Sequence, residues 1–209
     1  MQNPPFDQRI ARILVRPLIG TFISPNHLTA VSLLFTLAGA VCLARGESFW
    51  QHCGASLFVM GRFMDHWDGE LARQADKQSR FGYYFDYVTG GLSYAALFCG
   101  IGFGLIESVL DTWAISLGFM GAVSAVLAMG FNMWIDAETS GDADGIAAVY
   151  PNIAGFELED GIYLLAPLTW LGCLVPFFTA ASIGAVLYCL WTVIKPFRLW
   201  IRHRENKLS

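Results

Sequence analysis

The chain has 209 residues, of which 55% are hydrophobic and only 14% are charged, and its formal net charge is −4. A soluble domain of this length needs more surface charge than this composition supplies, so the mean hydropathy of +0.49 indicates an integral membrane protein. The acidic balance, without a basic patch interleaved with aromatic residues, excludes nucleic acid as a partner.

The first segment, residues 6–23, alternates apolar residues with Arg9, Arg12 and Arg16 at helical spacing. This basic amphipathic pattern predicts a helix that lies on the anionic face of a membrane, with an ordinary solvated helix as the alternative. The arginines interrupt any continuous apolar core, so a cleavable signal peptide is not expected here.

Six apolar segments follow, and each is close to the ~20 residues that ~30 Å of hydrocarbon requires. The expected spans are residues 27–44, 49–72, 81–105 and 113–135, and two more between 162 and 200 that divide near 174–177. No internal repeat or long linker separates domains. We therefore expect an all-α integral membrane protein with a single domain over residues 1–209, whose six-helix bundle occupies residues 27–200.

Lysines and arginines cluster at the N-terminus, between the second and third spans (residues 73–80) and near the C-terminus (residues 195–207). With six spans, these three clusters lie on the same side of the membrane. The positive-inside rule predicts that this side is cytoplasmic.

Carboxylates and glycines interrupt the apolar pattern between the second and third spans. Asp65, Asp68 and Ala72 follow each other at intervals of three and four residues, which places them on one helix face. Gly82, Asp86 and Gly90 recur every four residues on the next helix. Because ionisable groups in apolar helices are costly and normally face a polar cavity, we expect a functional site that can hold a hard divalent cation.

The run from Asp65 to Gly90 resembles the signature of the CDP-alcohol phosphotransferase family, D-x-x-D-G-x-x-A-R, eight residues, then G-x-x-x-D-x-x-x-D. Every element matches except the last aspartate, which is Gly90 in this chain. The resemblance implies transfer of a phosphoalcohol group from a CDP-linked lipid, most concretely CDP-diacylglycerol, to an alcohol acceptor with release of CMP. It also implies a role in phospholipid biosynthesis, dependence on Mg²⁺ or Mn²⁺, a homodimer, and a location in a bacterial inner membrane. Because the basic clusters lie on the side of the motif, the positive-inside rule predicts that the active site faces the cytoplasm.

Carried over residue by residue, the resemblance assigns Asp65, Asp68 and Asp86 as metal ligands. It assigns substrate contacts to Gly69 and Gly82, which let the nucleotide approach the helix backbones. It assigns further substrate contacts to Ala72, the small residue beside them, and to Arg73, whose guanidinium is suited to hold a phosphate. Asn26 precedes the first span in a P-N-x-x-T pattern. It is expected near the substrate or metal, although helix capping explains the pattern equally well.

Gly90 stands where the family has both a metal ligand and the proposed base, next to Asp86 in the catalytic stripe. Three explanations remain open: another base is recruited, the chain binds CDP-lipid or metal without turnover, or this position has been altered. The nearest replacement bases by topology are Glu157, Glu159 and Asp160, which also suit the N-terminus of the fifth span as capping residues.

Several further interpretations stay open. His66 is a candidate acceptor contact, and residues 136–161 are expected to form a solvated acidic loop. The glycines of the third span suit close packing or a dimer interface. The acceptor can be glycerol 3-phosphate, serine or inositol phosphate, and a non-catalytic binding protein or a transporter is the rival class of function.

Overall fold

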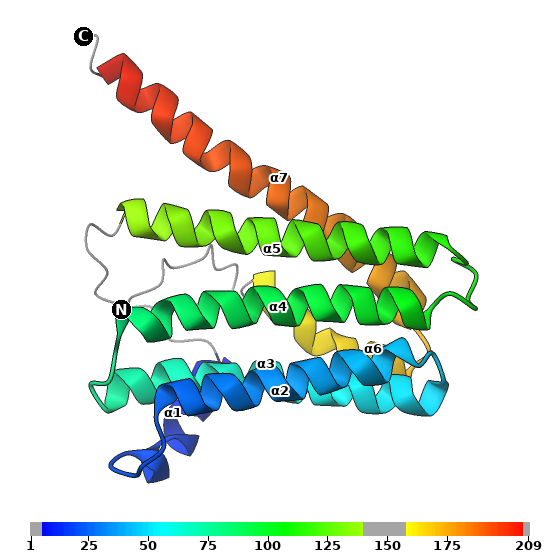
Figure 1. The fold of residues 1–209 in the computed structure, drawn as a ribbon, viewed down its shortest axis with the longest axis horizontal. Helices are drawn as coiled ribbons and strands as arrows, with labels where there is room; N and C mark the ends of the chain where they lie inside the picture. The colour runs from blue at the N-terminus through cyan, green and yellow to red at the C-terminus, as the bar shows by residue number, and fades with distance from the viewer. Residues whose placement is uncertain (1–5, 140–157, 207–209) are drawn as a thin grey trace.

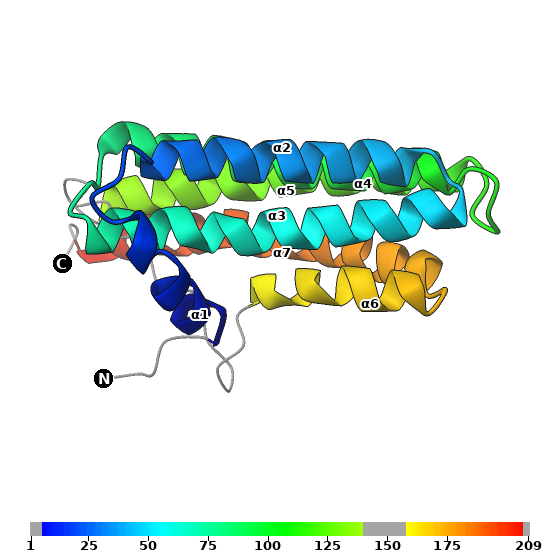
Figure 2. The same cartoon turned by 90° about the horizontal axis from the view of Figure 1, so that it is seen from below.

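The structure is a computed structural model that describes residues 6–139 and 158–206, and all regular secondary structure in this part of the chain is helical (Figure 1). Four long helices run roughly along one direction, the last long helix runs obliquely to them (Figure 1), and a short helix lies beside the second of the four (Figure 2). The long helices and the short one are α2 (Pro25–Ala44), α3 (Ser48–Gln74), α4 (Arg80–Gly104), α5 (Trp113–Thr139), α6 (Leu165–Trp170) and α7 (Leu174–Asn206).

Four of these helices are long and apolar enough to cross a membrane: α2, α4, α5 and α7. Helix α3 has 27 residues, but it carries the charged half of the motif. Helix α6 has only six residues and follows a 3-10 segment, η2 (Leu158–Leu164), and Gly172 ends it with a φ of +75°. The boundary before α7 therefore lies slightly earlier than predicted, and the count of six spans stays a prediction.

The N-terminal helix is shorter than the sequence pattern predicts. Helix α1 (Phe6–Leu14) stops well before residue 23, and a 3-10 turn, η1 (Arg16–Leu18), follows it. Pro17 lacks a backbone N–H, and Gly20 has a φ of +82°, so the chain turns here toward α2. Contact of α1 with a membrane surface stays a prediction.

Local capping fixes the starts of α2 and α4. The Ser24 hydroxyl accepts a hydrogen bond from the backbone N–H of His27, whose ring nitrogen accepts one in return from the Ser24 N–H. Ser79 caps α4 by accepting from the Gly82 N–H at 3.0 Å. Both helices thus begin at the end of the bundle where α3 finishes (Figure 1).

Small residues bring α2, α3 and α4 into close contact. A Cβ placed on Gly54 of α3 would lie 2.6 Å from the carbonyl oxygen of Gly39 on α2. Gly100 and Gly104 of α4 approach the carbonyl groups of Ala40 and Leu43 just as closely. The glycines near the end of α4 therefore allow close helix packing within the chain, and a dimer stays a prediction.

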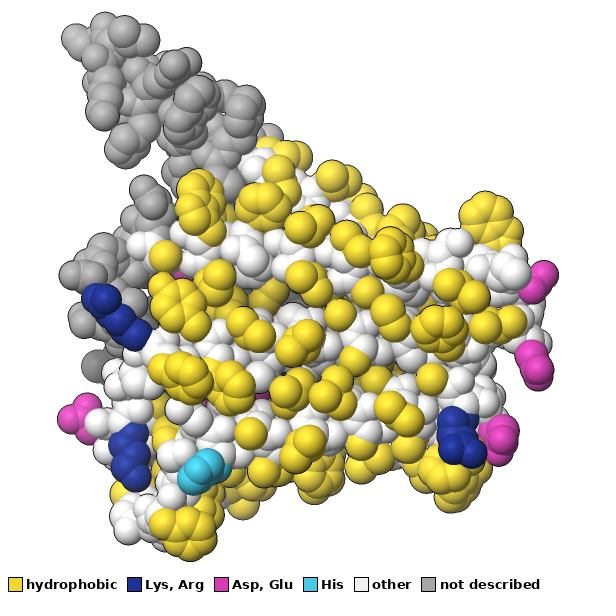
Figure 3. Space-filling model, in the orientation of Figure 1, with side chains coloured by type: hydrophobic (Ala, Val, Ile, Leu, Met, Phe, Trp, Pro, Cys, Tyr) yellow, Lys and Arg dark blue, Asp and Glu magenta, His cyan; other side chains and the backbone are white. Residues whose placement is uncertain are grey.

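The visible outer face of the bundle is covered by hydrophobic side chains, and charged side chains gather at its two ends (Figure 3). Helix α1, the α3–α4 turn and the end of α7 share one end, while the α2–α3 and α4–α5 turns share the other (Figure 1). This arrangement is that of a multi-pass membrane protein with two polar ends.

Candidate functional site

The three predicted aspartates come together where α3 and α4 meet. Asp65 and Asp68 project from α3 and Asp86 from α4, and one oxygen of each lies within 4.8 Å of the others. Asp68 is buried, Asp65 is half-buried and Asp86 is exposed. Opposite ligands of a six-coordinate Mg²⁺ are about 4.2 Å apart. The oxygen chemistry and spacing of this set therefore fit a hard divalent cation after small adjustments.

Two hydroxyl groups of α2 orient the aspartates of α3. The buried Thr29 hydroxyl donates to Asp68 Oδ2, and Ser32 donates to Asp65 Oδ1 at 3.2 Å. The Ser32 hydroxyl also lies 2.9 Å from the carbonyl oxygen of Gly61. Sequence reasoning did not assign these contacts, although hydroxyl residues three apart in an apolar helix are a recognisable signal.

Arg62 is a second feature that sequence reasoning missed. It lies one turn before Asp65 on α3, is 5% exposed, and donates from Nη1 to Asp65 Oδ2 at 2.7 Å. Its guanidinium carbon lies 5.1 Å from the ring centre of Tyr94 on α4. An arginine inside an apolar segment, three residues before an aspartate, is the sequence signal that points to it.

Arg73, the predicted phosphate ligand, is held by a neighbour on its own helix. Its Nε and Nη2 donate to Glu70 Oε2 at 3.1 and 2.8 Å, and Glu70 also accepts from Arg12 of α1. Its Nη1 lies on the side of Gly69, 3.5 Å from where a Cβ at that glycine would be. Glu70 thus fixes the guanidinium beside the motif.

The two motif glycines differ in what surrounds them. At Gly69 an added Cβ would make only ordinary contacts with Arg73, so helix packing does not explain this glycine. At Gly82 it would lie 3.1 Å from both Asn26 Oδ1 and Ser79 Oγ. Asn26, the first-helix candidate, therefore lies against the start of α4. Ala72 is half-buried, one turn beyond Asp68 on α3.

Position 90 faces a side chain of α5. A Cβ on Gly90 would lie 2.6 Å from the terminal methyl group of Met129. Gly90 itself is buried. The space that an aspartate would enter at this position is thus bordered by a flexible thioether.

The remaining candidates contact other side chains or lie outside the described part of the chain. Asp136 is not in a loop as predicted: α5 continues to Thr139, and the buried carboxylate of Asp136 accepts from the Tyr87 hydroxyl. The ring of His66 lies 6.4 Å from that of Tyr163, next to η2 and α6. The replacement bases Glu157, Glu159 and Asp160, and most of the acidic loop, lie outside the described side chains.

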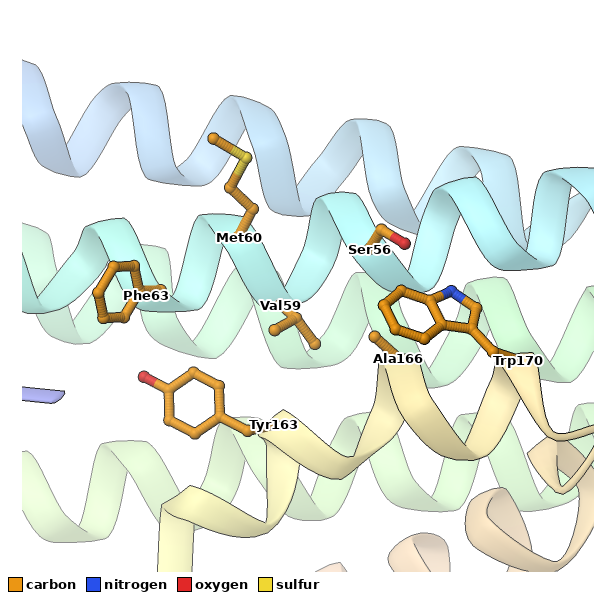
Figure 4. A pocket seen from close by; sticks show the side chains of 7 residues that line it. All are labelled: Ser56, Val59, Met60, Phe63, Tyr163, Ala166 and Trp170. Atoms are coloured by element: carbon orange, nitrogen blue, oxygen red, sulfur yellow. The ribbon is translucent and has the colours of Figure 1, made fainter. Parts of the chain in front are cut away.

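An apolar pocket of about 290 Å³ lies between α3 and the η2–α6 segment. Its lining consists of Ser56, Val59, Met60, Phe63, Tyr163, Ala166 and Trp170 (Figure 4). Phe63 and Tyr163 lie at one end of the pocket, and Ser56 and Trp170 lie at the other (Figure 4). Because Tyr163 also contacts His66, the pocket begins next to the motif and continues along α3.

Comparison of the sequence with known proteins gives consistent matches. A sequence model of the CDP-alcohol phosphatidyltransferase family matches residues 22–201. The archaetidylinositol phosphate synthase of Pyrococcus horikoshii is 30% identical over 175 residues, which are 81% of this chain and 89% of that protein. The phosphatidylinositol phosphate synthase of Streptomyces avermitilis is 37% identical over 84 residues, 40% of this chain and 33% of that protein.

Solved structures match the fold. A crystal structure of Mycobacterium tuberculosis phosphatidylinositol phosphate synthase with CDP-DAG bound aligns with a TM-score of 0.64 at 20% identity, covering 90% of this chain and 92% of that one. The same enzyme in complex with manganese and citrate aligns with the same score and identity, covering 90% and 87%. At this identity, the likeness concerns the fold.

Proposed function

The chain belongs to the CDP-alcohol phosphatidyltransferase family, and we propose that it transfers a phosphatidyl group from CDP-diacylglycerol to the hydroxyl of an alcohol, releasing CMP. The observation that carries this proposal is the cluster of Asp65, Asp68 and Asp86 within 4.8 Å, at the motif positions of this family. A bound Mg²⁺ or Mn²⁺ supplies Lewis-acid stabilisation of the charge that develops when a diphosphate is cleaved.

The chain's own residues position the donor around that cation. The three aspartates hold the ion, with Thr29 and Ser32 fixing the two carboxylates of α3. Arg73 contacts a donor phosphate with the side of its guanidinium that faces Gly69, while Glu70 holds the opposite side. The open space at Gly69 lets the cytidine diphosphate approach the helix backbone.

The substrate also contacts Asn26, Gly82 and Ala72 in this proposal. Asn26 offers a side-chain amide at the start of α2. Gly82 has no side chain, so the facing first turn of α4 leaves room for the donor beside Asn26. Ala72 keeps the turn of α3 after Asp68 small. Asp86, the exposed carboxylate one turn before Gly90 on α4, is the catalytic residue of this proposal besides its role as a metal ligand.

The apolar pocket between α3 and α6 suits the hydrocarbon of the donor. It begins near His66 and Tyr163, beside the motif, and its lining is almost entirely apolar. A lipid whose diphosphate lies at the aspartates has to extend its chains away from that polar end, and this pocket offers a path along α3.

Inositol phosphate is the first acceptor to test, because the relatives of this chain carry the names of inositol phosphate synthases. Glycerol 3-phosphate and serine remain in the panel. We further propose a single membrane domain in a bacterial inner membrane, a cytoplasmic active site and a homodimer, on the strength of the basic clusters at one end of the bundle and of the family.

The decisive experiment measures CMP release from CDP-diacylglycerol in the presence of Mn²⁺ or Mg²⁺ and each acceptor. We expect release that needs both metal and acceptor and that is lost in Asp86→Ala. Metal-dependent donor binding without CMP release would instead support the second candidate, a binding-only relative. The observation that favours this candidate is Gly90, which offers no carboxylate to take the acceptor's proton.

A further inference from the structure

Arg62 is a buried cation held against the candidate metal site. Its side chain is 6% exposed and that of its partner Asp65 is 13% exposed, and the two form a salt bridge of 2.7 Å. Tyr94 lies under the guanidinium on the side of α4. Arginine stays charged when it is buried, and removing that charge from water is costly unless a partner compensates it. A fixed charge at this depth therefore changes what the site can bind.

Arg62 reduces the negative charge that the cluster offers to a cation. Asp65 is paired with Arg62 through the 2.7 Å salt bridge, so its carboxylate attracts a divalent ion less strongly than it would without the arginine. A second ion would bring two more positive charges next to a guanidinium that cannot lose its proton.

A second ion also finds one carboxylate fewer on α4, because only Asp86 is present there. Gly90 has no side chain, and the methyl group of Met129 borders the position from which a carboxylate would project. The thioether of methionine is a soft, weak ligand that Mg²⁺ does not favour. The fixed charge of Arg62 and the missing carboxylate at position 90 therefore both disfavour a second divalent ion.

We propose that Arg62 is the built-in cation of this site, so that the site binds one divalent ion and Arg62 supplies the positive charge that a second ion would otherwise bring. The inference rests on the proposed function, since the ion is the one bound together with the CDP-linked donor. Arg62 acts through Asp65 and through the charge of the site, as a positioning residue.

The test is the number of Mn²⁺ ions bound per chain. Purified full-length protein in lipid nanodiscs is titrated with Mn²⁺ in the presence of CDP-diacylglycerol, and free Mn²⁺ is measured by electron paramagnetic resonance. We expect one ion for the unmodified chain and for Arg62→Lys, which keeps the charge. We expect two ions for the double variant Arg62→Gln with Gly90→Asp, and one ion for its matched control, Gly90→Asp alone, in which Arg62 is still present.

The outcomes separate this inference from the proposed function. Two ions in the unmodified chain, or only one in a folded Arg62→Gln, Gly90→Asp variant, would overturn the role of Arg62 and leave the proposed function standing. No Mn²⁺ bound by the unmodified chain with donor present would overturn both. If the double variant does not fold, Gly90→Asp alone decides the question: two ions with Arg62 present would overturn the role of Arg62, and one ion supports it.

Discussion

The hydroxyl of Thr29 on α2 orients one carboxylate of the candidate metal site between α3 and α4. It is buried and donates to Asp68, the most deeply buried of the three aspartates. Loss of a group that orients a ligand typically lowers metal affinity by 10–100-fold. We therefore expect Thr29→Val to weaken Mn²⁺ binding by about 10-fold or more, measured by Mn²⁺ titration, whereas Thr29→Ser keeps the hydroxyl and stays near the original affinity. Equal affinity in Thr29→Val and Thr29→Ser would contradict the orienting role.

Gly90 makes the second prediction at the level of a single residue. The variant Gly90→Asp restores the base of the family motif, and only the end of the flexible Met129 side chain has to move. General-base catalysis contributes typically 10²–10⁴-fold, so acceptor-dependent CMP release should rise by about 10²-fold or more. The control is Gly90→Asn, which has nearly the same size but no carboxylate. A similar rate in both variants would show that a base at this position is not limiting.

The packing of α2 against α3 depends on two facing glycines. In Gly54→Ala the new methyl group would meet the Gly39 carbonyl at 2.6 Å, so backbone has to move. Overpacking of this kind costs about 1–3 kcal/mol, and we expect a lower melting temperature in detergent. Gly184→Ala on α7 is the matched control, because an added Cβ there meets nothing within 4 Å. If both variants melt at the same temperature, the α2–α3 contact is looser than described.

The apolar pocket between α3 and α6 gives a prediction about the hydrocarbon chains of the donor. In Val59→Trp the larger ring fills the middle of the pocket. We expect a higher KM for CDP-diacylglycerol with long chains and little change for a donor with very short chains. Leu34→Trp, on the exposed face of α2, is the control. An equal effect on both donors would exclude the pocket as the site of the hydrocarbon.

At the level of the whole molecule, the spacing of charged and small residues is sufficient to predict which side chains of the motif meet. Intervals of three and four residues along each helix determine the faces on which Asp65, Asp68 and Asp86 lie. The partners from other helices are harder to predict, because contacts such as Thr29 with Asp68 depend on how α2 and α3 are aligned. Arg62 is not part of the family motif, which begins at Asp65, so the motif alone does not point to it.

Some helix ends can be predicted from neighbouring residues in the sequence, whereas others depend on contacts with another helix. The starts of α2 and α4 carry local signals, Ser24 and Ser79, and lie within two residues of the predicted positions. The acidic surroundings of Asp136 predict a loop, yet its contact with Tyr87 of α4 holds it in α5. A hydrogen bond between two helices cannot be read from either helix alone.

The distribution of charge over the whole bundle predicts its orientation in the membrane. Lys77 is exposed in the α3–α4 turn, and Glu107 is exposed at the opposite end, in the α4–α5 turn. Because the basic clusters share the end that carries Lys77, the positive-inside rule places that end in the cytoplasm. The test uses a background in which Cys42, Cys53 and Cys173 are replaced by alanine, which removes the cysteines nearest the opposite end of the bundle. In this background we expect a membrane-impermeant thiol reagent to label Glu107→Cys in intact cells. Lys77→Cys should be labelled only after the cells are permeabilised. The reverse pattern would place the aspartates outside, away from the cytoplasmic supply of CDP-activated lipid, and would contradict both the orientation and the proposed access of substrates.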